Sequence, residues 1–562
     1  MMKRSLCHIT VVFFLLLKIP VASGQQKITN PILAGFYPDP SICRVGNDYY
    51  LVNSSFAYYP GLPVFHSKDL VHWQQIGAAM DRPEQLILDG AGVSRGLFAP
   101  TIRYNDGVFY IMCTLIDKGG NFIITAKNPA GPWSNPVWIP EVKGIDPSID
   151  FIDGKAYIVF NSDPPDNKTL WSGHRTIRMY AFDHKAMKVT GKEILLVNGG
   201  TDISKKPVWI EGPHLYKKDD YIYLMCAEGG TGYNHSEVIF RSKNVEGPYE
   251  PWDKNPILTQ RTLDPKRKNP VTTTGHADLV QTKEGNWYAV FLGCRPYEAD
   301  YINNGRETFM APVEWKDGWP VINPGYEEVQ YRYVTQSSSK NKTASAFSGN
   351  YSFRDGFDKT LLNNRYSFLR TVREPWYNLN DKKGFLSLHL GPQTAAGKGN
   401  PSFIGFRQAH LKGEASTALS FTAASENEKA GLLVFQNEQH YYWLCQSVEN
   451  GQQVLQLLKS AATTDKEPEL LAAEKIEAVP GKNIELKIKA NGNTYAFYYA
   501  LKKGDWQLLK DGVDAKFLST QVAGGFVGCM YAMYATSNGK SSSSKAYFDW
   551  FGYKGDDDVY KK

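Results

Sequence analysis

Five times between residues 38 and 291, a short patch rich in Pro, Gly, Asp or His is followed by an aromatic, apolar run. The spacing is constant, because the residues ten positions before Tyr50, Tyr110, Tyr157, Tyr223 and Tyr288 are Pro40, Pro100, Pro147, Pro213 and Asp278. Short aromatic and β-branched runs bounded by turn residues are typical of strands. Repeats of about 60 residues built from strands predict the blades of a β-propeller.

The repeat fixes the fold class of the first part of the chain. No stretch has the helical periodicity that a crossover helix between parallel strands would need, which argues against an α/β sheet. Five blades of about 60 residues would fill about 300 residues. We therefore predict an all-β protein whose residues 28–335 form a five-bladed β-propeller.

A second domain is expected after a linker. Residues 336–346 are rich in Ser, Lys, Asn and Ala, a composition typical of linkers. Alternating apolar segments then recur, separated by Gly and Asn turns, at 386–390, 418–421, 432–435, 484–488 and 495–499. This pattern predicts a β-sandwich over residues 347–562.

The propeller repeat also predicts where charged residues gather. The first strand of each blade lines the central axis, so equivalent positions of different blades converge there. The five positions at the start of these strands are Asp39, Ala99, Asp146, Glu211 and His276. An Asp before Pro can simply initiate a turn. Three acids and a His at one register of five instead favour a shared functional pocket.

Three converging carboxyl groups suit glycoside hydrolysis. That reaction needs one carboxylic acid to protonate the leaving oxygen and one carboxylate to act as base or nucleophile. A third acid can keep the proton donor protonated, because like charges resist joint ionisation. A metal site built from His276 and the acids is the rival interpretation. Only one His occupies this register and no His pair has ligand spacing, so we predict no metal site and a His276 that contacts substrate or water.

Seven motifs in order carry a family resemblance, and they lie at residues 30–42, 144–148, 211–216, 227–231, 275–280, 293–296 and 305–308. From about residue 28 to the C-terminus, the chain resembles glycoside hydrolase family 43. The most similar branch contains β-xylosidases and α-L-arabinofuranosidases with a C-terminal concanavalin-like β-sandwich. The resemblance implies an inverting enzyme on a five-bladed propeller. It implies Asp39 as general base, Glu211 as general acid and Asp146 as the residue that tunes and orients the acid.

The resemblance also implies substrate contacts. Arg295 matches an arginine that reaches sugar hydroxyls, and His276 matches an axial histidine. Phe56 matches an aromatic in the pocket wall, and Phe526 matches an aromatic on a sandwich loop that reaches the site. Phe98 stands where relatives carry Trp or Tyr, so its ring can stack on a sugar but cannot donate a hydrogen bond.

These observations predict an exo-acting inverting glycosidase. It would release non-reducing-end α-L-arabinofuranosyl residues, β-D-xylosyl residues or both from oligosaccharides of arabinoxylan, arabinan or xyloglucan. The alternatives are a strict β-xylosidase and a catalytically idle carbohydrate-binding propeller. No cofactor is expected to be required, and a structural Ca²⁺ is left open. The chain has no basic stripe of the kind that nucleic acid requires, so no nucleic-acid partner is expected.

The N-terminus predicts export. Lys3 and Arg4 precede an apolar run from Ile9 to Leu17, and small residues at 22–24 offer a cleavage site. This pattern predicts a signal peptide over residues 1–24 and a periplasmic protein, with secretion as the alternative. The run is too short to span a bilayer, and no membrane insertion is expected. Six cysteines remain after cleavage, and most lie in apolar strand runs, so we expect buried free thiols.

Overall fold

Five antiparallel sheets make up the first half of the computed structural model, which describes residues 27–335, 346–461, 463, 466–477 and 482–561. Each sheet contains four strands from one stretch of the chain, and the fourth sheet carries one more. The predicted signal peptide lies outside the described residues, as does the predicted linker except for its last residue. The first two sheets contain β2 (Ser41–Val45), β3 (Asp48–Val52), β5 (Gly61–Ser67) and β6 (Gln74–Met80), then β7 (Thr101–Asn105), β8 (Val108–Leu115), β9 (Gly120–Ala126) and β10 (Val137–Trp138).

The remaining three sheets follow in chain order. The third contains β11 (Ile145–Ile152), β12 (Lys155–Ser162), β13 (Thr176–Asp183) and β14 (Lys188–Asn198). The fourth contains β15 (Glu211–Lys218), β16 (Tyr221–Glu228), β17 (Ser236–Ser242), β18 (Glu250–Pro251) and β19 (Leu258–Thr259). The fifth contains β20 (Thr272–Gln281), β21 (Trp287–Cys294), β22 (Glu307–Lys316) and β23 (Trp319–Ile322).

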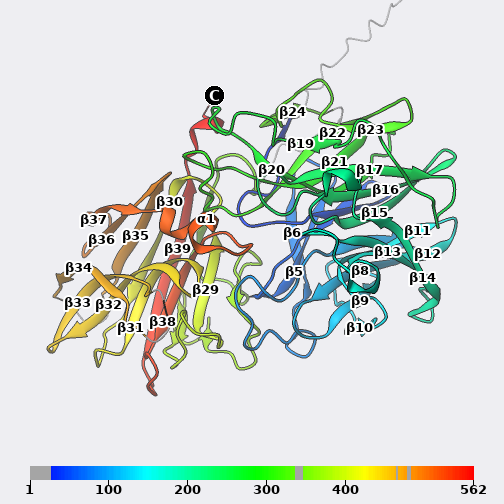
Figure 1. The fold of residues 1–562 in the computed structure, drawn as a ribbon. Helices are drawn as coiled ribbons and strands as arrows, with labels where there is room; N and C mark the ends of the chain where they lie inside the picture. The colour runs from blue at the N-terminus through cyan, green and yellow to red at the C-terminus, as the bar shows by residue number, and fades with distance from the viewer. Residues whose placement is uncertain (1–26, 336–345, 462, 464–465, 478–481, 562) are drawn as a thin grey trace, which may run out of the picture.

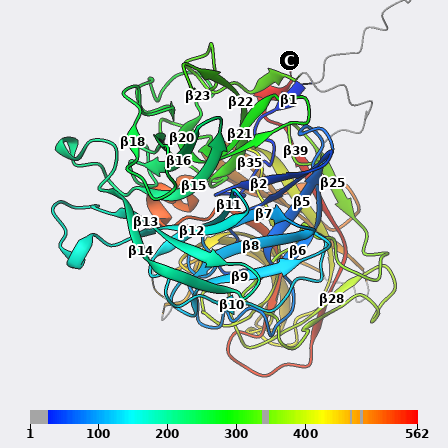
Figure 2. The same ribbon diagram turned by 90° about the vertical axis from the view of Figure 1, so that its right-hand side faces the viewer.

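The sheets are arranged in a ring (Figure 2). The first strand of each sheet contacts the first strand of the next, and contacts between β20 and β2 close the circle. This is the arrangement of a propeller in which each sheet is a blade and its first strand lies innermost. The five repeats found in the sequence correspond to these five sheets one by one.

Turn chemistry explains why the innermost hairpins form where they do. Asp106-Gly107 joins β7 to β8, and Asp153-Gly154 joins β11 to β12. Both residues of each pair have positive φ, with values of 47° and 83° in the first turn and 50° and 75° in the second. Asp-Gly pairs favour this backbone, whose twist matches that of the paired strands.

The second half of the chain is a β-sandwich of two antiparallel sheets, which lies beside the propeller (Figure 1). One sheet contains β25 (Ser352–Asp355), β27 (Tyr377–Asn378), β28 (Leu386–His389), β30 (Lys412–Ser420), β35 (Ile484–Asn491), β36 (Thr494–Ala500), β37 (Gln507–Asp514) and β39 (Lys545–Gly555). The other contains β29 (Ser402–Arg407), β31 (Lys429–Asn437), β32 (His440–Glu449), β33 (Gln452–Lys459), β34 (Glu469–Lys475) and β38 (Met530–Thr536). The predicted all-β sandwich is confirmed.

Helices are short and few in the described residues. They are α1 (Thr520–Ala523) and four 3₁₀ turns, η1 (Pro165–Asn167), η2 (Ile203–Lys205), η3 (Lys516–Leu518) and η4 (Asp558–Tyr560). No helix in this part of the chain has the length and apolar character that crossing a bilayer requires. All six cysteines from Cys43 to Cys529 are buried free thiols, as predicted.

The two domains share a core and one small sheet. β4 (Tyr58–Tyr59) of the propeller pairs with β26 (Phe368–Leu369) of the second domain. Buried apolar side chains of both domains, such as Leu86 and Ile404, belong to one continuous cluster. β1 (Lys27–Thr29) pairs with β24 (Arg332–Val334), which joins the two ends of the propeller. The sandwich is therefore packed firmly against one side of the propeller.

Candidate active site

The starts of the innermost strands converge on one cavity of about 400 Å³. Asp39 lies two residues before β2, Asp146 is the second residue of β11, and Glu211 is the first residue of β15. His276 lies within β20. All four line the cavity, as their shared register in the repeat predicts.

Irregular backbone turns these side chains toward the axis. Asp39, Asp146 and His276 have φ values of 50°, 51° and 52°, in the left-handed region that such residues rarely adopt. The strand register shifts next to Asp146 and His276. Such bulges remove a residue from the ladder and re-aim its side chain. Gly212, beside Glu211, must lack a side chain, because a Cβ there would lie 2.8 Å from Nε2 of His276.

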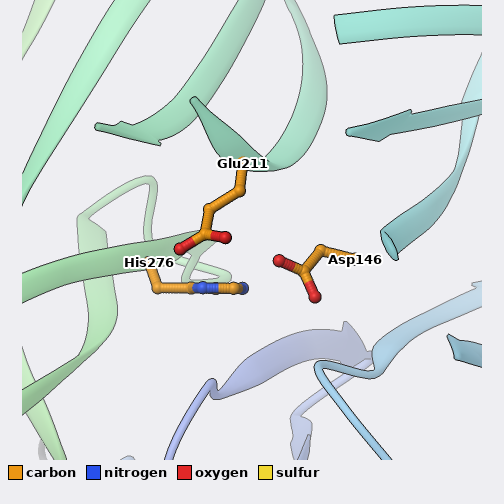
Figure 3. Close-up of side chains that lie close together, drawn as sticks. All are labelled: Asp146, Glu211 and His276. Carbon is orange, nitrogen blue, oxygen red and sulfur yellow. The ribbon is translucent and has the colours of Figure 1, made fainter. Parts of the chain in front are cut away.

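The side chains of Asp146, Glu211 and His276 lie close together in the cavity (Figure 3). Each offers one oxygen or nitrogen atom within 4.8 Å of those of the other two. Burial, together with the charges of Asp146 and Asp39, raises the pKa of Glu211 well above its usual value. Burial and the charge of Asp39 also raise the pKa of Asp146, to about 7. This part of the cavity therefore favours a bound proton on Glu211 at neutral pH.

Asp39 has a different environment. Its carboxylate accepts hydrogen bonds from Nη1 of Arg306, at 3.2 Å, and from the hydroxyl of Ser54. Nδ1 of His276 lies 4.0 Å away. Burial opposes ionisation, but Arg306, His276 and Ser54 together outweigh it and lower the pKa of Asp39. One cavity thus holds an ionised carboxylate and a protonated carboxylic acid.

Three phenyl rings form an apolar wall of the cavity. The centroid of Phe56 lies 5.5 Å from that of Phe98 and 5.9 Å from that of Phe526. Phe526 belongs to the sandwich, and Ser94 Oγ of the propeller accepts a hydrogen bond from its backbone N–H at 2.9 Å. All three predicted aromatics line the cavity, which both domains therefore build.

Arg295 does not line this cavity, so its predicted contact with substrate is wrong. Its guanidinium is buried and ion-paired, with Nε 2.7 Å from Glu307 and Nη1 2.7 Å from Asp557. Nη2 donates a further hydrogen bond to the carbonyl of Ala409 at 2.7 Å. Each of the three guanidinium nitrogen atoms donates to a protein group, so Arg295 is not available to bind a sugar. Two other arginines, Arg95 and Arg306, line the cavity, and Arg306 hydrogen-bonds Asp39.

Sequence reasoning missed several lining residues. Arg306 lies in the motif at 305–308, so the family resemblance held a signal for it, but the role was given to Arg295 in the motif at 293–296. Trp209 and Val208 precede Glu211 in the chain, and only the structure places them beside it. Arg95 and Thr231 also line the cavity, and neither shares the register of the acids.

The cavity could also hold a cation through Asp146, Glu211 and His276. A divalent ion would require both carboxylates to be ionised. Burial and neighbouring carboxylates raise the pKa of both groups, and the guanidinium of Arg306 adds a positive charge to the same cavity. These conditions favour a proton over a divalent ion at this position.

Comparison with known proteins agrees with this geometry. The model of glycosyl hydrolases family 43 matches residues 28–320. The chain belongs to glycosyl hydrolase family 43. The model of the β-xylosidase C-terminal concanavalin A-like domain matches residues 354–554, which covers the sandwich. The chain is therefore a family 43 glycosidase that acts on carbohydrate.

Relatives of this family 43 glycosidase match it over nearly its whole length. A xylosidase/arabinosidase of Butyrivibrio fibrisolvens is 41% identical, covering 93% of this chain and 98% of that protein. The non-reducing end alpha-L-arabinofuranosidase BoGH43B of Bacteroides ovatus is 40% identical, covering 99% of both chains. The solved structure of Bacteroides ovatus xyloglucan PUL GH43B superposes with a TM-score of 0.83, covering 94% of this chain and 99% of that one. The predicted family and fold class are confirmed.

Proposed function

We propose that this family 43 glycosidase removes terminal α-L-arabinofuranosyl residues with inversion, and β-D-xylosyl residues in the same pocket. The proposal rests on two carboxyl groups, Asp39 and Glu211, that line one cavity but have pKa values shifted in opposite directions. The pKa of Asp39 is lowered, whereas that of Glu211 is raised. Glycoside hydrolysis requires a base and an acid that reach the same bond, and both groups line one cavity here.

In the proposed reaction, ionised Asp39 takes a proton from a water molecule as the water oxygen attacks the anomeric carbon. Protonated Glu211 gives its proton to the glycosidic oxygen as the bond to that carbon breaks. The products are the free sugar of inverted configuration and the alcohol of the leaving group. Asp39 then returns its proton to solvent, and Glu211 takes one up.

The surrounding residues support these two roles. Arg306 and Ser54 hydrogen-bond Asp39 and keep it ionised and oriented. Asp146 raises the pKa of Glu211 by its charge. The phenyl rings of Phe56, Phe98 and Phe526 exclude water from one side and present an apolar surface to the sugar ring.

The choice of sugar rests on the relatives. Their names join xylosidase and arabinosidase activities, and one names an α-L-arabinofuranosidase. Fragments of arabinoxylan, arabinan or xyloglucan are the substrates we propose. A strict β-xylosidase is the alternative within the same chemistry.

The decisive experiment is incubation with p-nitrophenyl α-L-arabinofuranoside and β-D-xyloside, with proton NMR of the first sugar formed. We expect turnover of the arabinofuranoside and an inverted anomer. A retained anomer would overturn inversion, and turnover of the xyloside alone would make the enzyme a strict β-xylosidase. Saturable binding of oligosaccharides without turnover of either substrate would make it a sugar-binding propeller.

We also propose export to the periplasm, based on the predicted signal peptide over residues 1–24. Expression of the full chain in a Gram-negative host, followed by fractionation, tests this proposal. Activity retained in the cytoplasm at full length would contradict it.

A further inference from the structure

A tryptophan beside the proton donor is held in place by contacts that none of the proposed reaction steps uses. Trp209 lies two residues before Glu211 in the chain, and both residues line the catalytic cavity. The backbone of Trp209 has a φ of 57°, in the left-handed region that a bulky residue rarely adopts. Its N–H donates to the carbonyl of Gly173 at 2.7 Å. Strained backbone of this kind persists only where surrounding contacts hold it, and it is frequent at active sites.

Arg175 of the third blade holds the indole ring of Trp209. The guanidinium carbon lies 4.7 Å from the centroid of the ring, a cation–π contact. Nε and Nη2 of Arg175 donate to Oδ1 of Asn161 at 3.2 and 3.0 Å, and Nη1 pairs with Asp163. The side-chain amide of Asn161 in turn donates to the carbonyl of Ile210, the residue directly before the acid. One network therefore holds both the indole and the backbone that leads to the proton donor.

The side chain of Trp209 hydrogen-bonds the carboxyl group of Glu211, and the indole N–H is the one donor that a tryptophan side chain has. The other charged or titratable groups that line the cavity with this carboxyl are Asp39, Arg95, Asp146, His276 and Arg306. Burial and the charges of Asp146 and Asp39 raise the pKa of Glu211, whereas Arg306 and the hydrogen bond from Trp209 lower it. A hydrogen bond to the charged form of an acid favours that form, so Trp209 acts against Asp146.

We propose that Trp209, held by Arg175, is a positioning residue for the proton donor, because its indole N–H stabilises the carboxylate that Glu211 becomes. The inference rests on the proposed function, in which the proton of Glu211 passes to the glycosidic oxygen while that oxygen keeps the electron pair of the broken bond. An acid crowded by other carboxylates keeps its proton at neutral pH but donates it less readily. Trp209 offsets this loss, so Asp146 and Trp209 set the strength of the acid from opposite sides.

The test is the pH profile of kcat/KM on an arabinofuranosyl oligosaccharide, whose leaving group must receive the proton. Trp209→Phe keeps an aromatic ring and removes the N–H, so the basic limb should move to higher pH by about one unit. The rate on p-nitrophenyl arabinofuranoside, whose leaving group needs no protonation, should fall much less than the rate on the oligosaccharide. Trp171→Phe is the matched control, because the Trp171 indole donates to the carbonyl of Pro207 at 2.6 Å and does not line the cavity. Its basic limb should stay in place.

Arg175→Lys is the second variant, and it decides the question if Trp209→Phe does not fold. Lysine keeps the positive charge but cannot reproduce a planar fork that spans Asn161 and the indole, so the basic limb should move in the same direction by a smaller amount. An unmoved or lowered basic limb, in a protein whose wild type hydrolyses the oligosaccharide with inversion, would overturn this inference and leave the proposed function standing. Equal shifts in Trp209→Phe and Trp171→Phe would also overturn it, since they would show a general change in the loop. If the wild type hydrolyses neither substrate, the proposed function and this inference fall together.

Discussion

The innermost strands carry two groups of polar residues that the protein treats in opposite ways. The catalytic group is Asp39, Asp146, Glu211 and His276. A few residues further along the same strands lies a second group, called here the axial cluster, which consists of Ser41, Arg103, Asp150, His214, Tyr216 and Asp278. Both groups are built around buried carboxylates, although Arg103 and Tyr216 of the axial cluster are only partly buried.

In the axial cluster every charge is compensated. Asp278 accepts hydrogen bonds from the hydroxyl of Ser41 at 2.7 Å, from Nη1 of Arg103 at 2.8 Å and from the hydroxyl of Tyr216 at 2.6 Å. Arg103 also donates to Asp150 at 2.8 Å. These partners overcome burial and hold the pKa of Asp278 far below its usual value.

The catalytic group keeps part of its charge uncompensated. Burial and the charge of Asp39 raise the pKa of Asp146, and burial with the charges of Asp146 and Asp39 raises the pKa of Glu211. The propeller can therefore give a buried carboxylate several hydrogen-bond and ion-pair partners, as it does for Asp278, and such partners make the site rigid. At the catalytic group, carboxyl groups lie near one another with fewer compensating partners, and this keeps Glu211 protonated at neutral pH.

The largest effect should come from removing the two reacting groups. We expect Asp39→Ala to lower kcat by about 10³-fold or more on every substrate, because the variant cannot activate water whichever leaving group the substrate carries. Glu211→Ala should have a comparable effect on oligosaccharides and a much smaller one on p-nitrophenyl glycosides, whose leaving group needs no protonation. Steady-state kinetics on both substrates measure this, and equal losses in both variants would mean that the roles are misassigned.

The next largest effect should be a difference in unfolding free energy between variants of the axial cluster and variants of the catalytic group. Asp278→Ala removes a carboxylate that compensates buried Arg103, and breaking a buried pair in this way costs about 3–5 kcal/mol of unfolding free energy. Asp146→Asn relieves crowding instead, and we expect its stability to equal or exceed that of the wild type. Urea denaturation of the two variants is the measurement. If Asp146→Asn were the more damaging change, the contrast between the groups would be wrong.

The pH dependence of stability should show a smaller effect. The pKa of Asp146 is raised to about 7 in the folded protein from an ordinary value near 3.8. The folded state therefore holds a proton that the unfolded chain releases between these values, and stability falls as pH rises through this window. The slope for one such proton is at most about 1.4 kcal/mol per pH unit. Asp146→Asn should flatten the curve of melting temperature against pH, and an unchanged curve would contradict the shift.

Removing metal ions should have the smallest effect. Because crowding favours a proton on Glu211, we expect dialysis against EDTA to leave kcat/KM within twofold of its starting value. Loss of activity that Ca²⁺ restores would show that Asp146, Glu211 and His276 act together as metal ligands, and would contradict the proton-donor account.

Sequence reasoning placed the catalytic group well because the propeller repeats itself. Once Asp39, Asp146 and Glu211 share a register, the ring of strands must bring them together. The substrate contact of Arg295, which the family resemblance implied, was wrong. Its neighbour Asp557 lies 262 residues away in the chain, and no local pattern indicates that the C-terminal segment occupies that guanidinium.

Other features depend on the same kind of distant packing. The pairing of β4 with β26 arises only where the sandwich docks on the propeller. The apolar patterns of each domain predict its own sheets and carry no information about the surface through which the domains meet. Phe526 was found only because it lies on a segment that resembles the family.

The central claim is that Asp146 keeps Glu211 protonated by its charge. The most direct test is the pH profile of kcat/KM for Asp146→Asn beside the wild type, since that quantity reports the ionisations of the free enzyme. Removing the neighbouring negative charge should lower the pKa of Glu211, so the basic limb should move to lower pH while the rate also falls. A basic limb that stays in place while the rate falls would contradict the claim and leave Asp146 as a residue that positions the substrate.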